Sequence, residues 1–315
     1  MKIAVLGPKG TFSDKAYAEY VALCGDDTSY EPVYYPTIDD VFSAVADGAD
    51  EEPQLGIVPI ENTLDGYVIR TLDLLLEKDV RVIDETMVPV AFSLVGNINC
   101  LEDIQTLYVQ FKAHGQCRQF INDLKNVKII NTESNMESYY QLENTPGVAA
   151  IVPTHIAKEE QNRFVKFDVT DSDYNHTRFI VFTKGLADIG ADISGCAKSL
   201  SRVNRSEGIS KKTTQDVSQE PVQDVTKVRI PAYIQPKVDR PGLLYSILKN
   251  FHDNQINLIS IMSRPTKQQL GTYNFYIEID IRCERLMVVY DTLRLVEQDN
   301  RIKLLGVYVE GTKND

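Results

Sequence analysis

Apolar positions along the first 180 residues alternate between two patterns. Short apolar runs typical of buried strands occupy residues 3–6, 33–35, 55–60, 107–109, 127–130 and 148–152, and residues 80–95 supply extended, β-branched segments. Between them lie segments with helical periodicity, two ending near residues 22 and 76 and others near 113–124, 134–143 and 153–159. A further helix is expected after Thr37, which has Asp40 three residues on. This alternation predicts an α/β domain with largely parallel strands.

The pattern changes after residue 185. Residues 186–225 are rich in Ser, Lys, Asp and Gln and have little apolar periodicity, so we interpret them as a linker. Residues 226–311 then predict strands at 228–234, 256–262, 273–281 and 304–309, with helices opened by Pro241 and spanning 286–296. The order βαββαβ is that of a ferredoxin-like sandwich, a fold that serves binding or regulation more often than catalysis.

Composition narrows the range of partners. The 315 residues carry a formal charge of −12, which disfavours nucleic acid and anionic membranes but still allows a small anionic substrate in a locally positive cleft. Only Lys2 precedes the short apolar run at 3–6, and no apolar stretch approaches the ~20 residues that cross a bilayer. We therefore expect a cytoplasmic protein.

The five cysteines are widely spaced and form no CxxC pair. This spacing is typical of reduced thiols rather than of disulfides or a zinc site. Cys117 follows His114 at helical spacing, which leaves a Cys/His nucleophile open. An ordinary helix face explains the pair without any chemistry, and we prefer that interpretation.

Four polar clusters stand where predicted strands begin or end. The turn at 7–13, with two glycines before a helix, suits either an anion site or a helix cap, and it lacks the pattern of a P-loop or a dinucleotide fingerprint. Residues 61–63 and 132–135 follow buried strands, at the sheet edge where open α/β folds bind ligands. The run at 175–178 sets a hydroxyl between an amide and a guanidinium, which suits holding an anion and offering it a proton, although an ordinary strand entry is also possible.

Together these clusters resemble the prephenate dehydratase family followed by an amino-acid-binding ACT domain. The shared motifs are Gly-Pro-x-Gly-Thr-Phe-Ser at 7–13, Pro-Ile-Glu-Asn at 59–62, Glu-Ser at 133–134 and Asn-x-Thr-Arg-Phe at 175–179. The resemblance covers residues 1–184 and 226–310. It implies a two-lobed, periplasmic-binding-protein-like catalytic domain over 1–185. Lobe 1 would comprise 1–77 and 165–185, lobe 2 would comprise 78–164, and the substrate cleft would lie between them.

The resemblance also implies a reaction and its residues. Prephenate would lose CO2 and a ring hydroxyl to give phenylpyruvate, without metal, nicotinamide or flavin, and Thr177 would donate a hydrogen bond or proton to the leaving hydroxyl. Glu61 and His114 would support the cleft, the latter in an Ala-His-Gly-Gln segment similar to the family's Ser-His-Pro-Gln. Arg178 would hold a carboxylate or brace its strand. The implied substrate-binding residues are Thr11, Asn62, Thr63, Ser134, Asn175 and Arg178.

The C-terminal segment resembles ACT domains at some motif positions and departs from them at others. It implies feedback regulation by phenylalanine and a homodimer or homotetramer formed through paired sheets. Met262 stands where the family's Glu-Ser-Arg-Pro has glutamate, and it would equally suit a core or interface position. The implied effector-binding residues are Gly242, Leu243, Leu244, Asn257, Leu258 and Met262.

Two departures keep alternatives open. Asn135 and Met136 replace the last two residues of the family's Glu-Ser-Thr-Ala, which suggests altered substrate preference, weak activity or a non-catalytic ligand sensor. Action on arogenate, the amino counterpart of prephenate, is a further alternative. Chorismate mutase activity ranks low, because that helical segment precedes the dehydratase in fused proteins and the motif here begins at residue 7.

Overall fold

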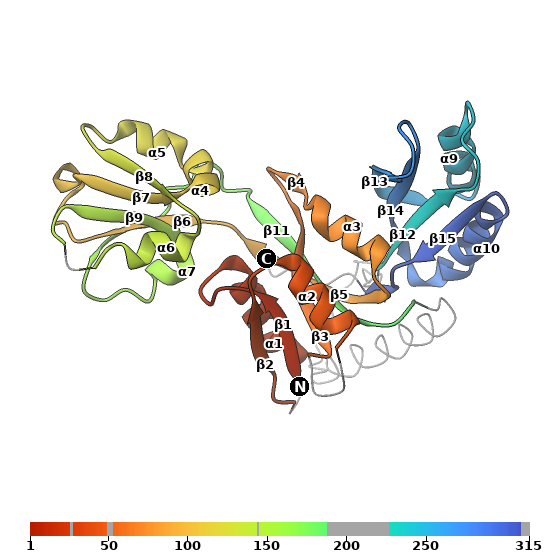
Figure 1. Cartoon of the computed structure of the whole chain (residues 1–315), viewed down its shortest axis with the longest axis horizontal. Helices are drawn as coiled ribbons and strands as arrows, with labels where there is room; N and C mark the ends of the chain where they lie inside the picture. The colour runs from red at the N-terminus through yellow and green to blue at the C-terminus, as the bar shows by residue number, and fades with distance from the viewer. Residues whose placement is uncertain (26–27, 49–52, 144, 188–226, 310–315) are drawn as a thin grey trace, which may run out of the picture. The chain divides into compact units, whose positions relative to one another are not determined.

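A computed structural model describes residues 1–25, 28–48, 53–143, 145–187 and 227–309, and Figure 1 shows its elements. The expected linker lies outside these residues from position 188 onward. Contacts divide the chain into two compact units. Unit 1 comprises Met1–Ala44, Glu51–Ile69 and Thr86–Phe179, and unit 2 comprises Val45–Asp50, Arg70–Glu85 and Ile180–Asp315. No helix within the described ranges has the length and apolar character needed to cross a bilayer.

The first sheet contains the N-terminal strands in the order β2-β1-β3-β11-β5, with β4 paired to β3. Its strands are β1 (Lys2–Leu6), β2 (Glu31–Tyr35), β3 (Leu55–Asn62), β4 (Gly66–Tyr67), β5 (Val80–Pro89) and β11 (His176–Lys184). The helices between them are α1 (Phe12–Cys24), α2 (Ile38–Ala46) and α3 (Ile69–Glu77). The predicted cap of α2 is confirmed, since Thr37 Oγ1 accepts a hydrogen bond from the N–H of Asp40 at 3.1 Å.

The second sheet has the order β10-β6-β9-β7-β8. It is built from β6 (Phe92–Gly96), β7 (Thr106–Gln110), β8 (Lys128–Thr132), β9 (Val148–Pro153) and β10 (Phe164–Lys166). A short 3-10 helix (Leu101–Asp103) and four α-helices connect these strands: α4 (Phe111–Gln116), α5 (Arg118–Asp123), α6 (Asn135–Tyr140) and α7 (Thr154–Ala157). The single helix predicted over 113–124 is therefore wrong, because the chain leaves helical geometry at the buried Cys117.

The division between the two sheets differs from the predicted lobes. Strand β5 was expected in lobe 2 but belongs to the first sheet, so the second sheet begins only at β6. Strand β10, at the expected return point, pairs with β6 and still belongs to the second sheet. The reason is that residues 80–95 form two strands in different sheets, whereas the extended, β-branched character predicted for this segment does not show where one strand ends and the next begins.

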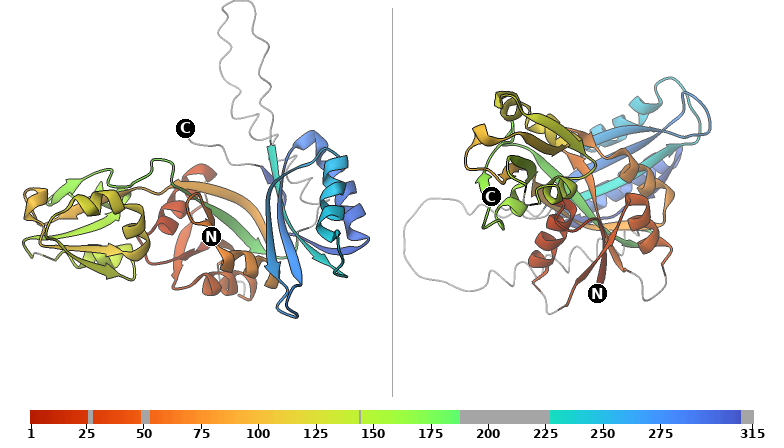
Figure 2. Two further views of the ribbon diagram at one scale, coloured as in Figure 1. Left: turned by 90° about the horizontal axis from the view of Figure 1, so that it is seen from above. Right: turned by 60° about the vertical axis from the view of Figure 1, so that its left-hand side comes forward.

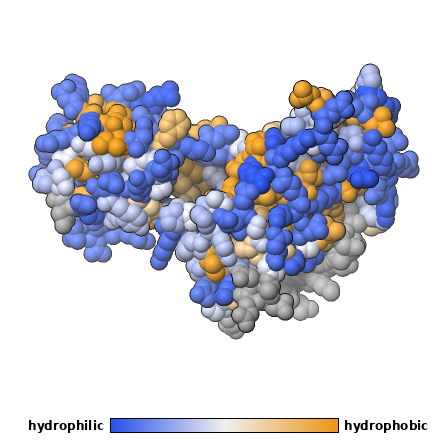
Figure 3. Space-filling model, viewed as in Figure 1, coloured by the Kyte–Doolittle hydropathy of each residue, from blue (hydrophilic) through white to orange (hydrophobic). Residues whose placement is uncertain are grey.

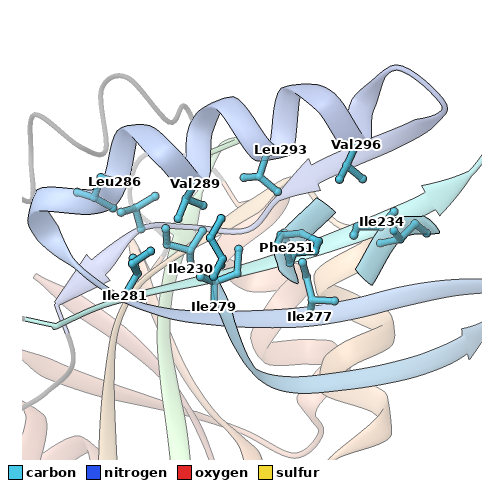
Figure 4. Packing of buried hydrophobic residues seen from close by; sticks show 14 of the residues in the cluster. Ile230, Ile234, Phe251, Ile277, Ile279, Ile281, Leu286, Val289, Leu293 and Val296 are labelled. Carbon is cyan, nitrogen blue, oxygen red and sulfur yellow. The ribbon is translucent and has the colours of Figure 1, made fainter. Parts of the chain in front are cut away.

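The C-terminal part of unit 2 has the predicted ferredoxin-like fold. Its strands β12 (Lys227–Pro236), β13 (Asn257–Pro265), β14 (Tyr273–Arg282) and β15 (Asn300–Leu304) form a sheet in the order β13-β14-β12-β15. Helices α9 (Leu243–Asp253) and α10 (Leu286–Glu297) cover one face of it (Figures 1 and 2). Apolar side chains of the strands point toward those of α10 and form the core (Figure 4).

Two boundaries in this fold correct the sequence predictions. Helix α9 begins at Leu243, with Gly242 as its N-cap residue at φ 79°, so Pro241 precedes the helix and is not its first residue. The last strand, expected over 304–309, consists instead of β15 and a two-residue strand β16 (Tyr308–Val309). Both pair with β12.

The other face of the C-terminal sheet contacts α3 and β5, also within unit 2. Tyr233 Oη donates to the carbonyl of Leu72 at 2.8 Å, and the N–H of Val82 donates to the carbonyl of Leu305 at 2.6 Å. Next to this bond the backbones approach so closely that a Cβ on Gly306 would lie 2.0 Å from the carbonyl oxygen of Val82. Glycine is therefore required at position 306 by space.

We predict that Gly306→Ala destabilises the protein by about 1–3 kcal/mol, because the added methyl forces the two backbones apart. The measurement is the free energy of unfolding from urea titration. Gly115→Ala is the matched control, since its added Cβ meets no atom within 4 Å, and its effect should stay below about 1 kcal/mol. Equal stability of the two variants would contradict the close approach.

A second prediction concerns Asp84 on β5, where burial raises the carboxyl pKa to about 6, with a smaller contribution from the neighbouring Glu85 carboxylate. Because this pKa lies above the ~3.9 of an unfolded aspartate, the charged form costs stability above pH 6 and the cost disappears as pH falls toward 4. Asp84→Asn should therefore raise the free energy of unfolding at pH 7.5 by about 1–2 kcal/mol. Melting curves from pH 4 to 8 test this, and a gain that does not vary with pH would contradict it.

Candidate functional site

Three of the polar clusters meet at one edge of the first sheet. Strand β1 runs parallel to β3, with Val5 opposite Ile57, so the turn after β1 and the end of β3 lie on the same side. The N–H of Thr63, just after β3, donates to the carbonyl of His176 at 3.0 Å. This bond brings the start of β11 to the same edge.

The side-chain amide of Asn62 connects these strands. Its Oδ1 accepts the backbone N–H groups of Leu64 and Asp65, both at 3.0 Å. With the oxygen fixed in this way, Nδ2 faces β11 and donates to Asn175 Oδ1 at 2.8 Å and to Thr177 Oγ1 at 2.9 Å. The backbone turn after β3 therefore determines which way the amide points.

This arrangement sets the polarity of the Thr177 hydroxyl. Because Oγ1 accepts a hydrogen bond from Asn62, its own O–H is available to donate to another group. Thr177 is half-buried, and none of the residues that the structure describes accepts a hydrogen bond from it. A ligand oxygen at this edge can take that bond.

Asn175 extends the network to α4. Its side chain is 2 % exposed, and its Nδ2 donates to Gln116 Oε1 at 3.0 Å. Gln116 is a site residue that the sequence motifs did not predict, and His114 was the residue predicted from the same segment. His114 instead contacts Asn131, with Nδ1 3.4 Å from Oδ1. Its side-chain amide could have pointed to Gln116, because a network of Asn side chains is extended by a group that both donates and accepts hydrogen bonds.

Arg178 lies beneath the network and is 6 % exposed. Its guanidinium donates to Glu61 Oε2 at 2.9 Å and to the hydroxyl of Tyr67 at 3.4 Å. Glu61 on β3 and Tyr67 on β4 are paired residues, so Arg178 ties β11 to this hairpin. Of the two roles considered for Arg178, these contacts favour bracing the strand.

Three further predicted residues are held by local hydrogen bonds. Thr63 Oγ1 donates to the carbonyl of Tyr174 at 2.9 Å and accepts the N–H of His176 at 3.0 Å. Thr11 caps α1 by accepting the N–H of Asp14 at 3.4 Å, and Ser134 caps α6 by accepting that of Glu137 at 3.0 Å. The helix cap considered for the turn at 7–13 is therefore confirmed, and Ser134 in the cluster at 132–135 caps a helix in the same way.

The glycine turn after β1 is covered by two side chains. Met136 is only 6 % exposed, and its sulfur lies 2.7 Å from the position of a Cβ on Gly10. His155 Nε2 lies 3.0 Å from the Gly10 carbonyl. Burial lowers the pKa of His155, so the neutral ring with its proton on Nε2 donates this bond. The methionine thus packs against the turn and does not project into solvent.

A family model described as prephenate dehydratase matches residues 3–186, more than half of the chain. The chain belongs to the prephenate dehydratase family. Among its relatives, the prephenate dehydratase of Methanocaldococcus jannaschii is 29 % identical over 303 residues, covering 96 % of this chain and 95 % of the relative.

Two solved structures of the family also match nearly the whole chain, at 26 % identity each. The prephenate dehydratase from Staphylococcus aureus has a TM-score of 0.71, with 99 % of this chain and 100 % of that chain covered. The enzyme from Arthrobacter aurescens, solved in complex with L-phenylalanine, has a TM-score of 0.73, with 98 % and 90 % covered. The two-lobed fold with a C-terminal domain is thus that of the prephenate dehydratase family.

The expected effector residues of this family member lie around α9 and β13. Gly242 caps α9, Leu243 packs against the core, and Leu244 is 38 % exposed. The remaining three are on β13, where Asn257 is exposed, Leu258 packs against the core, and Met262 is half-buried opposite Tyr276. They lie on a strand at the edge of the sheet.

Cys117 lies at the break between α4 and α5 and is completely buried. Burial, with a smaller contribution from the carboxylate of Asp171, raises the pKa of the Cys117 thiol to about 12. The nucleophile of a thiol reaction is the thiolate, which is almost absent at neutral pH with such a pKa. The Cys/His nucleophile is therefore excluded in this prephenate dehydratase family member.

We predict that iodoacetamide at pH 8 leaves Cys117 unmodified in the folded protein, because the thiol is both buried and protonated. Cys100, which is exposed, is the internal control and should be alkylated. Peptide mass spectrometry measures both in one sample. Rapid labelling of Cys117 would contradict its burial and reopen the Cys/His interpretation.

Proposed function

We propose that this chain is a carbon–oxygen lyase that converts prephenate to phenylpyruvate. The observation that carries the proposal is the Thr177 hydroxyl, which Asn62 holds as an acceptor and so leaves free to donate. In the reaction the C–C bond to the ring carboxylate breaks and releases CO2. The electron pair of that bond enters the ring, and the C–O bond to the ring hydroxyl breaks. Prephenate dianion thus gives phenylpyruvate anion, CO2 and hydroxide, which a proton from solvent turns into water.

The protein's task is to assist the departure of hydroxide, a poor leaving group. Thr177 donates a hydrogen bond to the leaving oxygen, where negative charge develops. Its own hydroxyl is made more acidic by the bond from Asn62, because successive hydrogen bonds polarise one another. A single donor of this kind contributes about 10²–10³ in rate. Aromatisation of the ring supplies much of the driving force.

The other site residues act by position in this proposal. Asn175 and Asn62 orient the substrate and Thr177, and Gln116 holds the amide of Asn175. Thr11, Thr63 and Ser134 are proposed substrate contacts through the faces of their hydroxyls that the local bonds leave open. Arg178 and Glu61 hold the strand that carries Thr177, and His114 supports the neighbouring helix.

Regulation by phenylalanine at the C-terminal domain is the second part of the proposal. It is supported by the ferredoxin-like fold of residues 227–309 and by the similar enzyme from Arthrobacter aurescens, which was solved with L-phenylalanine bound. We further propose a homodimer or homotetramer formed through these domains. The enzyme is expected to act in the cytoplasm, as part of aromatic amino acid biosynthesis.

We predict that Thr177→Val lowers kcat for phenylpyruvate formation at least about 100-fold, whereas Thr177→Ser retains much of the rate because it keeps the donor. Asn62→Asp should fall nearly as far. Its carboxylate still accepts from Leu64 and Asp65, but it cannot donate, so the Thr177 hydroxyl turns toward it. Absorbance of phenylpyruvate in alkali measures each rate.

Thr272→Val serves as the control, since this threonine bonds within the 265–273 hairpin and should leave the rate unchanged. Turnover that survives Thr177→Val would contradict the assigned donor. Folded wild-type protein that converts arogenate but not prephenate would move the substrate assignment to the amino compound. Binding of prephenate without turnover would favour the sensor alternative.

A further inference from the structure

A buried ion pair joins β5 to the C-terminal sheet. Arg229 on β12 donates through Nη1 to both carboxylate oxygens of Glu85 on β5, at 2.7 and 2.9 Å. The hydroxyl of Tyr308 on β16 donates to the same carboxylate at 3.1 Å. All three residues are less than 10 % exposed. All three belong to unit 2, and Glu85 is the last residue of the part of β5 that this unit contains.

Such a pair does more to fix geometry than to add stability. Burying two charges is costly, and a pair of well-packed apolar residues often holds a fold as well. What the pair does impose is position, because a carboxylate held by a guanidinium and a hydroxyl tolerates little sliding. The Val82–Leu305 hydrogen bond and the close approach at Gly306 add to this constraint. The first half of β5 is therefore fixed to the C-terminal sheet.

The same strand leads to the candidate site. Strand β5 continues from Glu85 to Pro89, and the N–H of the next residue, Val90, donates to the carbonyl of Asn175 at 2.8 Å. The five residue-to-residue steps from Glu85 to Val90 span about 17 Å when extended. Asn175 is also the residue whose side chain meets Asn62 beside Thr177. A displacement of β5 at Glu85 thus acts on the backbone of the Thr177 network.

The ion pair also stands in line with the expected effector residues. Asn257 on β13 pairs with Asp280 on β14, Asp280 pairs with Arg229 on β12, and Arg229 pairs with Tyr308 on β16. These four residues form one row across the sheet. A change at the β13 edge that shifts this row reaches Arg229 through paired strands.

We propose that the Glu85–Arg229 ion pair, with Tyr308, couples the C-terminal domain to the Thr177 network through β5. The inference rests on the proposed function for the identity of the effector. Binding that displaces the row of Asn257 moves Arg229, shifts Glu85 and β5, and misplaces Asn175. Glu85 and Arg229 are positioning residues here, with no contact to substrate or effector.

The test uses the full chain with Glu85→Leu and Arg229→Met combined, so that no unpaired charge remains. This variant should turn over prephenate within about threefold of wild type and still bind phenylalanine in calorimetry. It should need at least about fivefold more phenylalanine for half inhibition, the size of an ordinary coupling between sites. The amides of residues 86–88 and 90 should exchange hydrogen faster than in wild type.

Lys303→Met is the matched control. Lys303 Nζ donates from the same sheet to the carbonyls of Leu76 and Lys78, at 3.0 and 2.6 Å. It therefore holds the end of α3 and not β5, and its loss should leave inhibition unchanged. Equal loss of inhibition in this control would overturn the proposal, because any loosening of the sheet would then suffice.

Wild-type inhibition and wild-type exchange of the amides of residues 86–88 and 90 in the double variant would also overturn the coupling. Should that variant fail to fold, Tyr308→Phe removes only one hydroxyl and should give a smaller rise in the phenylalanine needed, and no rise would count against the proposal. Failure of the proposed function shows differently, as wild-type protein without turnover or inhibition. In that case hydrogen exchange in the double variant still decides the coupling.

Discussion

The side-chain amide of Asn62 is the constraint on which the candidate site depends. Two backbone N–H groups after β3 fix its oxygen, so its nitrogen must face β11. From that one orientation follow the polarity of the Thr177 hydroxyl, the orientation of Asn175 and the partner that Gln116 meets. A carboxylate at position 62 would have the same shape and would reverse the polarity of the threonine. The chemistry thus depends on hydrogen-bond direction as much as on distance.

Sequence patterns predicted most of the fold because buried apolar residues recur with the period of the helix or strand that carries them. Strands such as β1 and β9 are apolar along their length, and α10 has a clear apolar stripe. The errors occurred where sequence carries little local signal. The β-branched segment 80–95 holds two strands of different sheets, and α4 and α5 are separated at Cys117, which is completely buried. Gly242 in left-handed geometry displaced the start of α9 from Pro241.

The sequence predicted those site residues that belong to motifs at the ends of strands. Asn175 and Thr177 both lie within hydrogen-bonding reach of Asn62, as expected of strand ends at one sheet edge. Gln116 was missed because its partner is 59 positions away and no local pattern links them. The replacement by Met136 was noted in sequence, but not that its side chain packs against Gly10. Long-range pairing and the direction of a single side chain are decided by packing, which sequence periodicity does not encode.

The two faces of the C-terminal sheet lie in different environments. One face alternates apolar residues against α9 and α10, while the other presents Arg229, Tyr233 and Tyr308 to α3 and β5. The face shown in Figure 3 is mainly hydrophilic, with apolar side chains gathered in several groups, as expected of a chain with a charge of −12. Polar groups therefore lie on the surface and also between the C-terminal sheet and α3 and β5, where Arg229, Tyr233 and Tyr308 each form a hydrogen bond.

The central claim, that Thr177 donates to the leaving hydroxyl while Asn62 holds it, is tested most directly by a crystal structure of the protein with a saturated prephenate analogue that cannot aromatise. The account predicts the ring hydroxyl of the analogue about 3 Å from Thr177 Oγ1, with the Asn62 bond intact. A ring hydroxyl bound by another donor, with Thr177 turned toward the protein, would contradict it.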